Sequence, residues 1–310
     1  MWNRIGFQTL VMPIPMPNLF NKPFIVVFDL DECLGSFQFG CLVYHNIQPL
    51  FKNKHFPIDD LKYAMEEALE ASWLRPGIIH ILKTCKYYRE QKLIKKICLY
   101  TNSTDEYKWV TFLVERINVI IETSDIFDVV ISRQSPGRTQ VSEYEYRNYG
   151  GCQPKFVDDV IRLTESAPDT PVLFYDDRIF NLVPSTTGGV SSFQCVSPYL
   201  KKRFFIEDHE SLLEFIQDTM PDMVEYYLDR LSTVPYICGM EKYTDLSGEI
   251  KIPNRSDEMM FEKQTVIEFL PPLLANVIIL ADSSENQSEL LGSLQNQVNE
   301  NINAHLRCLQ

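Results

Sequence analysis

Two aspartates, Asp29 and Asp31, stand one residue apart directly after the apolar run FIVVF, in the stretch FDLDECLGSF. A carboxylate pair at the end of a buried strand provides the residue types that phosphoryl transfer needs. One carboxylate can attack phosphorus and form an aspartyl-phosphate, while its neighbour protonates the leaving oxygen and then deprotonates a water molecule. We predict the first role for Asp29 and the second for Asp31. The competing interpretation is an ordinary strand that ends in an acidic turn.

A second pair of acids, Asp176 and Asp177, follows the apolar run VLFY (172–175). Carboxylates and a phosphate dianion repel one another at short range, so such a site needs a cation, and an all-oxygen donor set favours Mg²⁺. We predict Asp176 as a side-chain ligand of that ion, together with Asp29 and the backbone carbonyl of Asp31. Asp177 is predicted to hold a metal-bound water or to lie just behind the ligands. A solvated turn is the alternative for this second pair.

Three further polar residues are candidates for binding the phosphate itself. Thr101 follows the apolar run KKICLY (95–100), and its hydroxyl and the neighbouring amides, with Asn102, can donate hydrogen bonds to phosphate oxygens. Lys155, in GGCQPKFVDDV, can offset the phosphate charge. Each also has a plainer interpretation. Thr101 would simply end a strand, and Lys155 would be one more surface lysine.

The elements that must position these residues alternate along the chain. Apolar runs predict strands, and amphipathic spacing predicts helices between them. The expected strands are 24–28, 95–100, 127–132, 172–175 and 192–197, and the expected helices are 57–72, one opened by Pro76, one carrying Trp109 to Ile117, 155–163, 207–220 and 223–231. This alternation is typical of a parallel sheet covered on both faces, a three-layer α/β fold. Its ligands bind beyond the carboxyl ends of the strands.

Two local predictions accompany this order of elements. Residues 36–56 are mixed, aromatic and turn-rich, and we expect an irregular or hairpin insertion that could act as a small flap. Ser103 and Glu106 match a capping box, which predicts that the next helix begins there.

The stretch FDLDECLG resembles the first motif of the haloacid dehalogenase superfamily of phosphohydrolases, an apolar strand followed by DxDx(T/V). Resemblances to the other three motifs follow in the expected order: Thr101 in LYTNS, Lys155 in GGCQPKFVDDV and Asp176–Asp177 in VLFYDDR. One DxD arises often by chance, whereas four motifs in order form a specific pattern. The resemblance implies a Mg²⁺-dependent phosphomonoester hydrolase with a three-layer α/β/α, Rossmann-like fold.

Within that superfamily the chain is most similar to phosphatases of the RNA polymerase C-terminal-domain type, including the NLI-interacting-factor-like branch. The similarity lies in FDLDECLG, in LRPG (74–77) and in LYTNS, and spans about residues 23–217. The intervals between motifs leave room for little or no cap, and an open site favours a phosphoprotein or phosphopeptide substrate, on serine or threonine. A nucleotide or polynucleotide-end phosphatase and a non-catalytic binding module with the same fold are the alternatives.

Two residues in the family-like segments have open roles. Cys33 stands where the family usually has Thr or Val. It either fills a small buried space or, as a thiol near the nucleophile, makes activity sensitive to oxidants. Arg75, in the LRPG segment, either contacts substrate or serves helix-entry packing or an ion pair.

The charge of the chain narrows its partners. A net charge of −13 over 310 residues argues against general nucleic-acid binding, because phosphate backbones reward Lys and Arg. The exception is the segment Lys83–Lys96, which holds Lys83, Lys86, Arg89, Lys92, Lys95 and Lys96. Such runs are usually solvated helix faces, and the alternative is a surface that receives acidic or multiply phosphorylated substrate.

Compartment and domain organisation follow from the remaining patterns. Eight scattered cysteines without a CxxC pair, no signal-peptide pattern and no membrane-spanning stretch predict an intracellular protein, cytoplasmic or nuclear, with no membrane association. We divide the chain into an arm (1–22), a phosphatase-like domain (23–218) and a C-terminal extension (219–310). In the extension, the spacing from Leu291 to Ile302 predicts either a helix that docks on a protein partner or a second copy, or a marginal tail helix.

Overall fold

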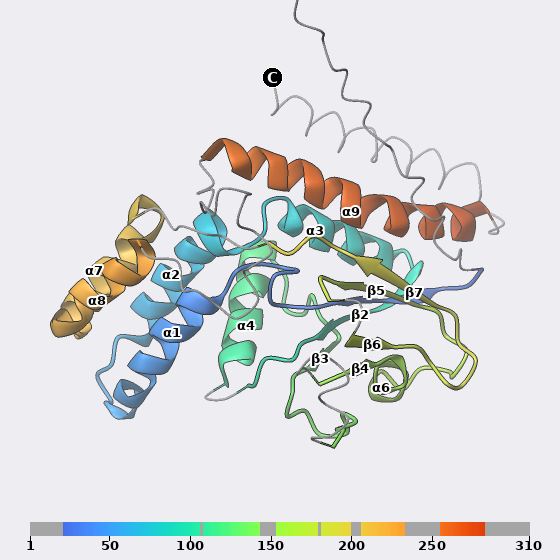
Figure 1. Cartoon of the computed structure of the whole chain (residues 1–310), viewed down its shortest axis with the longest axis horizontal. Helices are drawn as coiled ribbons and strands as arrows, with labels where there is room; N and C mark the ends of the chain where they lie inside the picture. The colour runs from blue at the N-terminus through green and yellow to red at the C-terminus, as the bar shows by residue number, and fades with distance from the viewer. Residues whose placement is uncertain are drawn as a thin grey trace, which may run out of the picture.

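A parallel sheet lies at the centre of the computed structural model, which describes residues 21–105, 108–142, 153–178, 181–199, 206–232 and 255–282 (Figure 1). The sheet has five strands in the order β3-β2-β1-β5-β7, and every neighbouring pair is parallel. A separate two-stranded sheet pairs β4 with β6. The strands are β1 (Phe24–Phe28), β2 (Ile94–Tyr100), β3 (Val129–Ile131), β4 (Lys155–Phe156), β5 (Val172–Asp176), β6 (Leu182–Val183) and β7 (Ser191–Cys195).

Helices occupy most of the connections between these strands. The helices are α1 (Gln38–Ile47), α2 (Ile58–Ala68), α3 (Ile78–Glu90), α4 (Trp109–Ile121), α6 (Val157–Leu163), α7 (Glu210–Thr219), α8 (Val224–Ser232) and α9 (Arg255–Asp282). Short helical turns are η1 (Gln48–Lys52), η2 (Leu69–Trp73), η5 (Ile206–His209) and η6 (Pro221–Met223). The predicted strands of the main sheet are confirmed, with ends shifted by at most two residues. The helix predicted over 155–163 begins at Val157 as α6, so Lys155 lies on β4 and not on that helix.

The main sheet separates two hydrophobic cores. In β1, Phe24, Val26 and Phe28 belong to one core, and Ile25 and Val27 belong to the other. The first core includes side chains of α3, α4 and α9, and the second includes those of α6. Figure 1 shows α3 and α9 on one side of the sheet and α6 with the small sheet on the other. Because both faces of β1 are buried, every position of FIVVF is apolar. The predicted three-layer α/β architecture is confirmed.

The strand order reverses at β1. The chain builds β2 and β3 on one side of β1 and then returns to build β5 and β7 on the other. In open parallel sheets, ligands bind at such a reversal, beyond the carboxyl ends of the strands. β1 runs directly into Asp29 and β5 ends at Asp176, so the two acids flank this point.

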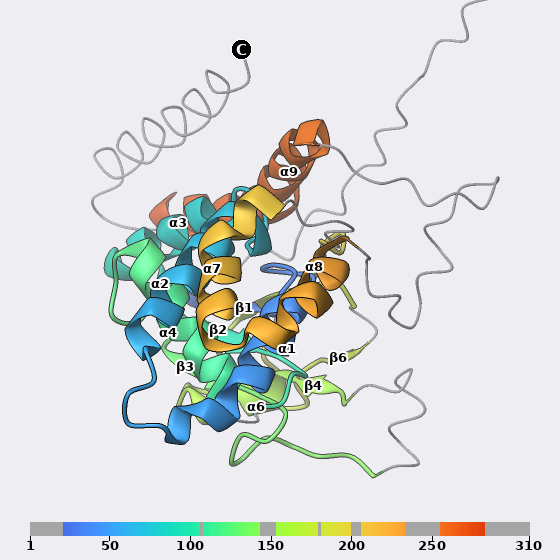
Figure 2. The same cartoon turned by 90° about the vertical axis from the view of Figure 1, so that its left-hand side faces the viewer.

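Four helices gather at the end of the molecule toward which the strands run. Figure 1 shows α1, α2, α7 and α8 there, and in Figure 2, which faces that end, they lie in front of β1 and β2. Helix α2 packs against both α7 and α4. This helical group therefore lies at the carboxyl edge of the sheet, where the site is predicted.

Residues 38–52 form α1 and η1, so the prediction of an irregular or hairpin insertion over 36–56 is wrong. Phe39, Val43 and Ile47 of α1 are spaced four residues apart and are buried on one helical face. Gly40, which resembles a turn signal in the sequence, instead lets a tryptophan ring approach, because a Cβ there would come within 2.4 Å of the ring. Helix α1 therefore packs one face into the core.

Helix α9 lies in the predicted C-terminal extension. It begins at Arg255, and residues 233–254 before it lie outside the described residues. Farther along α9, the Phe269 ring stacks on Phe28 and Tyr175, with centroids 6.1 and 4.8 Å apart. By its packing, α9 covers the sheet, although it follows the predicted boundary at residue 218.

Two remaining predictions concern a membrane-spanning helix and the C-terminal tail. No helix among the described residues is both long and apolar enough to cross a bilayer. The predicted tail helix from Leu291 to Ile302 lies outside the described residues.

Candidate active site

The loop after β1 places the first aspartate at the mouth of the sheet. The Asp29 backbone N–H donates to the carbonyl of Tyr175 at 2.9 Å, which ties the end of β1 to β5. Glu32 then adopts a left-handed conformation (φ 64°), and its N–H donates to the Gly35 carbonyl at 2.8 Å. A Cβ at Gly35 would lie 2.4 Å from the Trp73 carbonyl oxygen, so only glycine fits. The turn in FDLDECLG is therefore sterically specified.

One pocket of about 440 Å³ lies at the carboxyl edge of the sheet. The predicted site residues all line it: Asp29, Asp31, Thr101, Asn102, Lys155, Asp176 and Asp177. They come from four separate segments, namely the ends of β1, β2 and β5 and the start of β4. The structure thus brings every predicted residue into one place, while their chemical roles stay predictions.

Lys155 joins the two acids that flank the strand-order reversal. Its Nζ lies 2.6 Å from Asp29 Oδ1 and 2.7 Å from Asp176 Oδ2. The Lys155 and Asp176 side chains are 2% and 1% exposed. Burial alone would lower the pKa of Lys155, but the Asp176 and Asp29 carboxylates outweigh it and raise that pKa. The lysine therefore stays charged, and the interpretation of Lys155 as a surface residue is wrong.

Three carboxylates crowd together beside this lysine. Oxygens of Asp29, Asp176 and Asp177 lie within 4.8 Å of one another. Asn181, 2% exposed, lines the same pocket with a buried Oδ1 that accepts no hydrogen bond from the described residues. This donor set is all oxygen and carries more negative than positive charge, which fits a hard cation such as Mg²⁺. Asp29, Asp176 and Asp177 could supply the protein ligands.

Burial and crowding raise the pKa values of two of these acids. Burial, with the charges of Asp176 and Asp177, raises the pKa of Asp29 well above its usual range, against the opposing effect of Lys155. Burial, together with the charges of Asp176 and Glu32, raises the pKa of Asp177 to about 7. Carboxylates with such raised pKa values in a pocket are typical of functional sites. Burying like charges together destabilises the fold, so proteins retain such clusters mainly where they have a function.

Asp31 points to a different partner from the other acids. Its Oδ2 accepts a hydrogen bond from the Ser103 hydroxyl, and burial raises the pKa of Asp31. The Ser103–Asp31 bond connects the loops after β1 and β2. Within the loop after β2, Ser103 donates its N–H to Thr101 Oγ1 at 2.9 Å. An acid with a raised pKa that is held apart from the cluster of Asp29, Asp176 and Asp177 suits proton transfer.

The helix predicted to begin at the capping box begins later, because α4 starts only at Trp109. The Ser103 hydroxyl bonds Asp31, and Glu106, the second residue of the box, lies outside the described residues. Asp105 bonds the first turn of α4, where its carboxylate accepts the N–H of Thr111 at 3.1 Å and the Thr111 hydroxyl at 2.8 Å.

Several pocket residues were not predicted as site residues from the sequence. Ser103 and Asn181 supply polar groups, Arg178 lies 3.3 Å from Asp177 and 3.5 Å from Glu32, and α1 and α4 form a wall. The wall residues are Phe37, Gln38, Cys41 and Trp109. Asn181 follows the DD pair closely, and its proximity was the only available clue. The wall was missed because residues 36–56 were not recognised as helical.

Cys33 and Arg75 both receive structural roles. Cys33 is fully buried, its Sγ lies 3.7 Å from the Tyr175 carbonyl, and burial raises its pKa well above the usual value. A buried, protonated thiol reacts slowly with oxidants, which favours the filler role. The Arg75 guanidinium pairs with Glu268 of α9 at 2.7 Å and donates to the Ser197 carbonyl at 2.7 Å. Arg75 does not line the pocket, so packing and ion pairing account for it.

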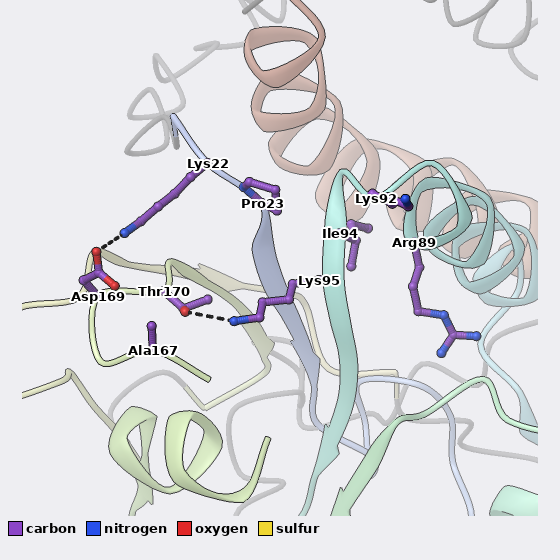
Figure 3. Close-up of a pocket in the computed structure, with 9 residues that line it drawn as sticks. All are labelled: Lys22, Pro23, Arg89, Lys92, Ile94, Lys95, Ala167, Asp169 and Thr170. Carbon is purple, nitrogen blue, oxygen red and sulfur yellow. Dashed lines mark hydrogen bonds and ion pairs between the residues drawn. The ribbon is translucent and has the colours of Figure 1, made fainter. Parts of the chain in front are cut away.

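The basic segment Lys83–Lys96 lies away from the pocket. Figure 3 shows Arg89, Lys92 and Lys95 around a separate groove of about 530 Å³ near the amino ends of β1 and β2. Across the groove, Lys22 pairs with Asp169. Since β1 has five residues, about 17 Å of strand separates this groove from Asp29.

Comparisons with known proteins add one distant structural likeness. No protein-family model matches the chain, and no curated protein matches it. Among solved structures, a protein from Bacteroides fragilis described as a haloacid dehalogenase-like hydrolase is similar over 61% of this chain and 93% of its own, with 14% identity and a TM-score of 0.31. A likeness of this strength carries no argument about activity, and the site rests on its own geometry.

Proposed function

We propose that the protein is a Mg²⁺-dependent phosphomonoester hydrolase that forms an aspartyl-phosphate on Asp29. The observation that supports this most directly is the convergence of four separate segments on one pocket at the strand-order reversal. Carboxylates, a hydroxyl and a buried lysine meet there in the combination that phosphoryl transfer requires. The sequence resemblance to haloacid dehalogenase phosphohydrolases points to the same chemistry.

Asp29 is the nucleophile in this proposal. Lys155 is bonded to its Oδ1, and no donor among the described residues is bonded to its Oδ2. Oδ2 attacks phosphorus, and the bond from phosphorus to the leaving oxygen breaks. A bound Mg²⁺ would neutralise the negative charge that gathers between the phosphate and the carboxylates. With Lys155, it would also favour the carboxylate form of Asp29 that the attack needs, against the burial that raises the pKa of Asp29. The charged Nζ of Lys155 keeps Asp29 oriented in the pocket.

Asp31 is the general acid and then the general base in this proposal. In the first step it donates its proton to the leaving oxygen, and in the second it takes a proton from the water that attacks the aspartyl-phosphate. The raised pKa of Asp31 favours the protonated form that the first step needs. The Ser103 hydroxyl holds one of its oxygens, which orients the carboxyl group. Phosphate leaves and Asp29 is restored as a carboxylate.

Hydrolysis of an aryl phosphate, with and without Mg²⁺, tests this proposal. Asp29→Asn should lower kcat/KM by roughly 10⁴-fold or more, because an amide cannot act as the nucleophile. Asp169→Asn is the matched control, since Asp169 is an exposed acid at the opposite edge of the sheet. Full activity of Asp29→Asn would exclude the proposed nucleophile, and no hydrolysis by the wild type would favour the non-catalytic module.

A phosphorylated serine or threonine in a protein is the substrate that we propose. Its support is the sequence similarity to C-terminal-domain phosphatases and the strongly negative chain, which disfavours polynucleotides. The test compares kcat/KM on a phosphoserine peptide, a nucleoside monophosphate and an oligonucleotide with a 5′-phosphate. A higher value on either of the last two substrates would replace the protein substrate with a nucleotide or polynucleotide end.

A further inference from the structure

A buried arginine connects the two loops that carry the predicted phosphate-binding residues. Arg138 is 5% exposed. Its Nη1 donates to the Thr101 carbonyl at 2.7 Å, and its Nη2 donates to Asn102 Oδ1. The same Nη2 lies 3.4 Å from the carbonyl of Pro154, the residue before Lys155. One guanidinium thus contacts the loop after β2 and the entry to β4.

Asn102 strengthens this connection from the other side. While its Oδ1 accepts from Arg138, its Nδ2 donates to the carbonyl of Gln153 at 2.9 Å. The side-chain amide of Asn102 therefore spans the two loops. This use of the amide was not expected from the sequence, which suggested that Asn102 binds phosphate directly.

A tight turn after β3 delivers Arg138 to this position. The Ser135 N–H donates to the Ser132 carbonyl at 3.2 Å, and the Arg138 N–H donates to the Ser135 carbonyl at 3.1 Å. Gly137 adopts a left-handed conformation (φ 81°), which glycine adopts at low cost. The chain therefore folds back and points Arg138 beneath the end of β2.

Tyr100 and Asp159 hold Arg138 in place through a ring contact and a hydrogen-bond network. The guanidinium carbon of Arg138 lies 4.8 Å from the centroid of the Tyr100 ring. The Tyr100 hydroxyl donates to Asp159 Oδ2 at 2.8 Å, and Thr139, the residue after Arg138, donates its N–H to the same oxygen at 3.0 Å. Asp159 is fully buried. A buried network with this many partners leaves the guanidinium one orientation.

We propose that Arg138 is a positioning residue for phosphate, which holds the Thr101–Asn102 loop and Lys155 at a fixed separation. The inference rests on the proposed function of the pocket. Arg138 does not line the pocket, so it acts through the loops that it joins. A planar fork can bond two loops at once, which an ammonium group cannot do as well. The structure thereby couples the end of β2 to the start of β4.

The opposite edge of the sheet offers a matched control. Arg89 also connects a helix to a loop by bonding backbone carbonyls, those of Asp125 at 2.9 Å and Ile126 at 3.1 Å, and it pairs with Asp128 at 3.1 Å. None of these residues lines the candidate active site. Loss of Arg89 should therefore lower stability without changing phosphate chemistry.

The experiment compares Arg138→Met, Arg138→Lys and Arg89→Met at a temperature where melting curves show each full-length variant folded. We expect Arg138→Met to lower kcat/KM for an aryl phosphate about 10²-fold, because small misplacements of binding groups cost that much. Its dissociation constant for orthophosphate, measured by calorimetry, should rise as well. Arg138→Lys should fall between Arg138→Met and the wild type, and Arg89→Met should keep wild-type values of both quantities.

A double-mutant cycle with Asn102→Ala separates positioning from general stability. If Arg138 acts through Asn102, the loss in the double variant Arg138→Met/Asn102→Ala is smaller than the product of the two single losses. Full additivity would overturn the inference. So would a loss in Arg89→Met equal to that in Arg138→Met.

Failure of the proposed function gives a different result. If the wild type binds orthophosphate but hydrolyses no phosphate ester, catalysis is excluded, and the orthophosphate affinities alone decide the role of Arg138. Equal affinities of the wild type and both Arg138 variants overturn the positioning role, even where hydrolysis is intact. If the wild type neither hydrolyses an aryl phosphate nor binds orthophosphate, both proposals are overturned. If Arg138→Met does not fold, Arg138→Lys decides in its place.

Discussion

The two edges of the main sheet differ in how deeply their charged groups are buried. At the carboxyl edge, Lys155 and Asp176 are 2% and 1% exposed and lie in a pocket of about 440 Å³. At the amino edge, Lys22 and Asp169 are 39% and 70% exposed and lie beside a groove of about 530 Å³. A buried charge costs far more than an exposed one, so a fold keeps such a cluster only with close compensation or for function. The comparison identifies the carboxyl edge as the candidate site without reference to any relative.

The largest expected difference between the edges concerns lysine. Lys155→Met removes the cation that contacts both Asp29 and Asp176, and we expect kcat/KM for an aryl phosphate to fall about 10²–10³-fold. Lys95→Met at the amino edge removes only a 3.5 Å contact with Thr170 and should leave kcat/KM unchanged. Similar rates for the two variants would remove the distinction between the edges.

The next effect concerns magnesium and stability. Mg²⁺ that binds only the folded protein should stabilise it by about 2.7 kcal/mol when its concentration is a hundred times its dissociation constant. We expect this gain in urea unfolding of the wild type and of Asp169→Asn, and its loss in Asp176→Asn. A gain that persists in Asp176→Asn would place the ion elsewhere.

A smaller effect is expected from pH. The pKa of Asp177 is about 7 in the folded protein against an ordinary 3.8, so the folded state holds this proton more tightly than the unfolded state. The resulting stability is present below pH 3.8 and is lost as pH rises through 7. In EDTA, Asp177→Asn should remove about 2 kcal/mol of the decline in unfolding free energy between pH 5 and pH 7.5. An unchanged slope in the variant would contradict the raised pKa.

The smallest effect is expected from charge reversal at the amino edge. Lys92 and Lys95 are exposed there. The double variant Lys92→Glu/Lys95→Glu should leave turnover of both an aryl phosphate and an acidic phosphopeptide unchanged, because screened surface charges so far from Asp29 contribute little. Lost turnover of the phosphopeptide alone would show that the groove receives acidic substrate.

The comparison also shows which features sequence patterns could reveal. The acids after β1 and β5 were found because each directly follows an apolar run, and a parallel sheet places such strand ends at one edge. Helix α1 was missed although Phe39, Val43 and Ile47 have helical spacing, because the segment 36–56, which contains Gly40, is mixed, aromatic and turn-rich. The same glycine is explained only by the ring that packs against it.

By itself, the sequence determined where the strands lie along the chain, that the sheet is covered on both faces, and which residues are delivered to the carboxyl edge. These features depend on residues close together in the chain, through side-chain periodicity and strand ends. Only the tertiary structure decided which loop meets which. Ser103 bonds Asp31 from 72 residues away, and Arg75 bonds Glu268 from 193 residues away. Local periodicity carries no information about such partners, because a hydrogen bond forms between whichever donor and acceptor the packed layers bring within reach.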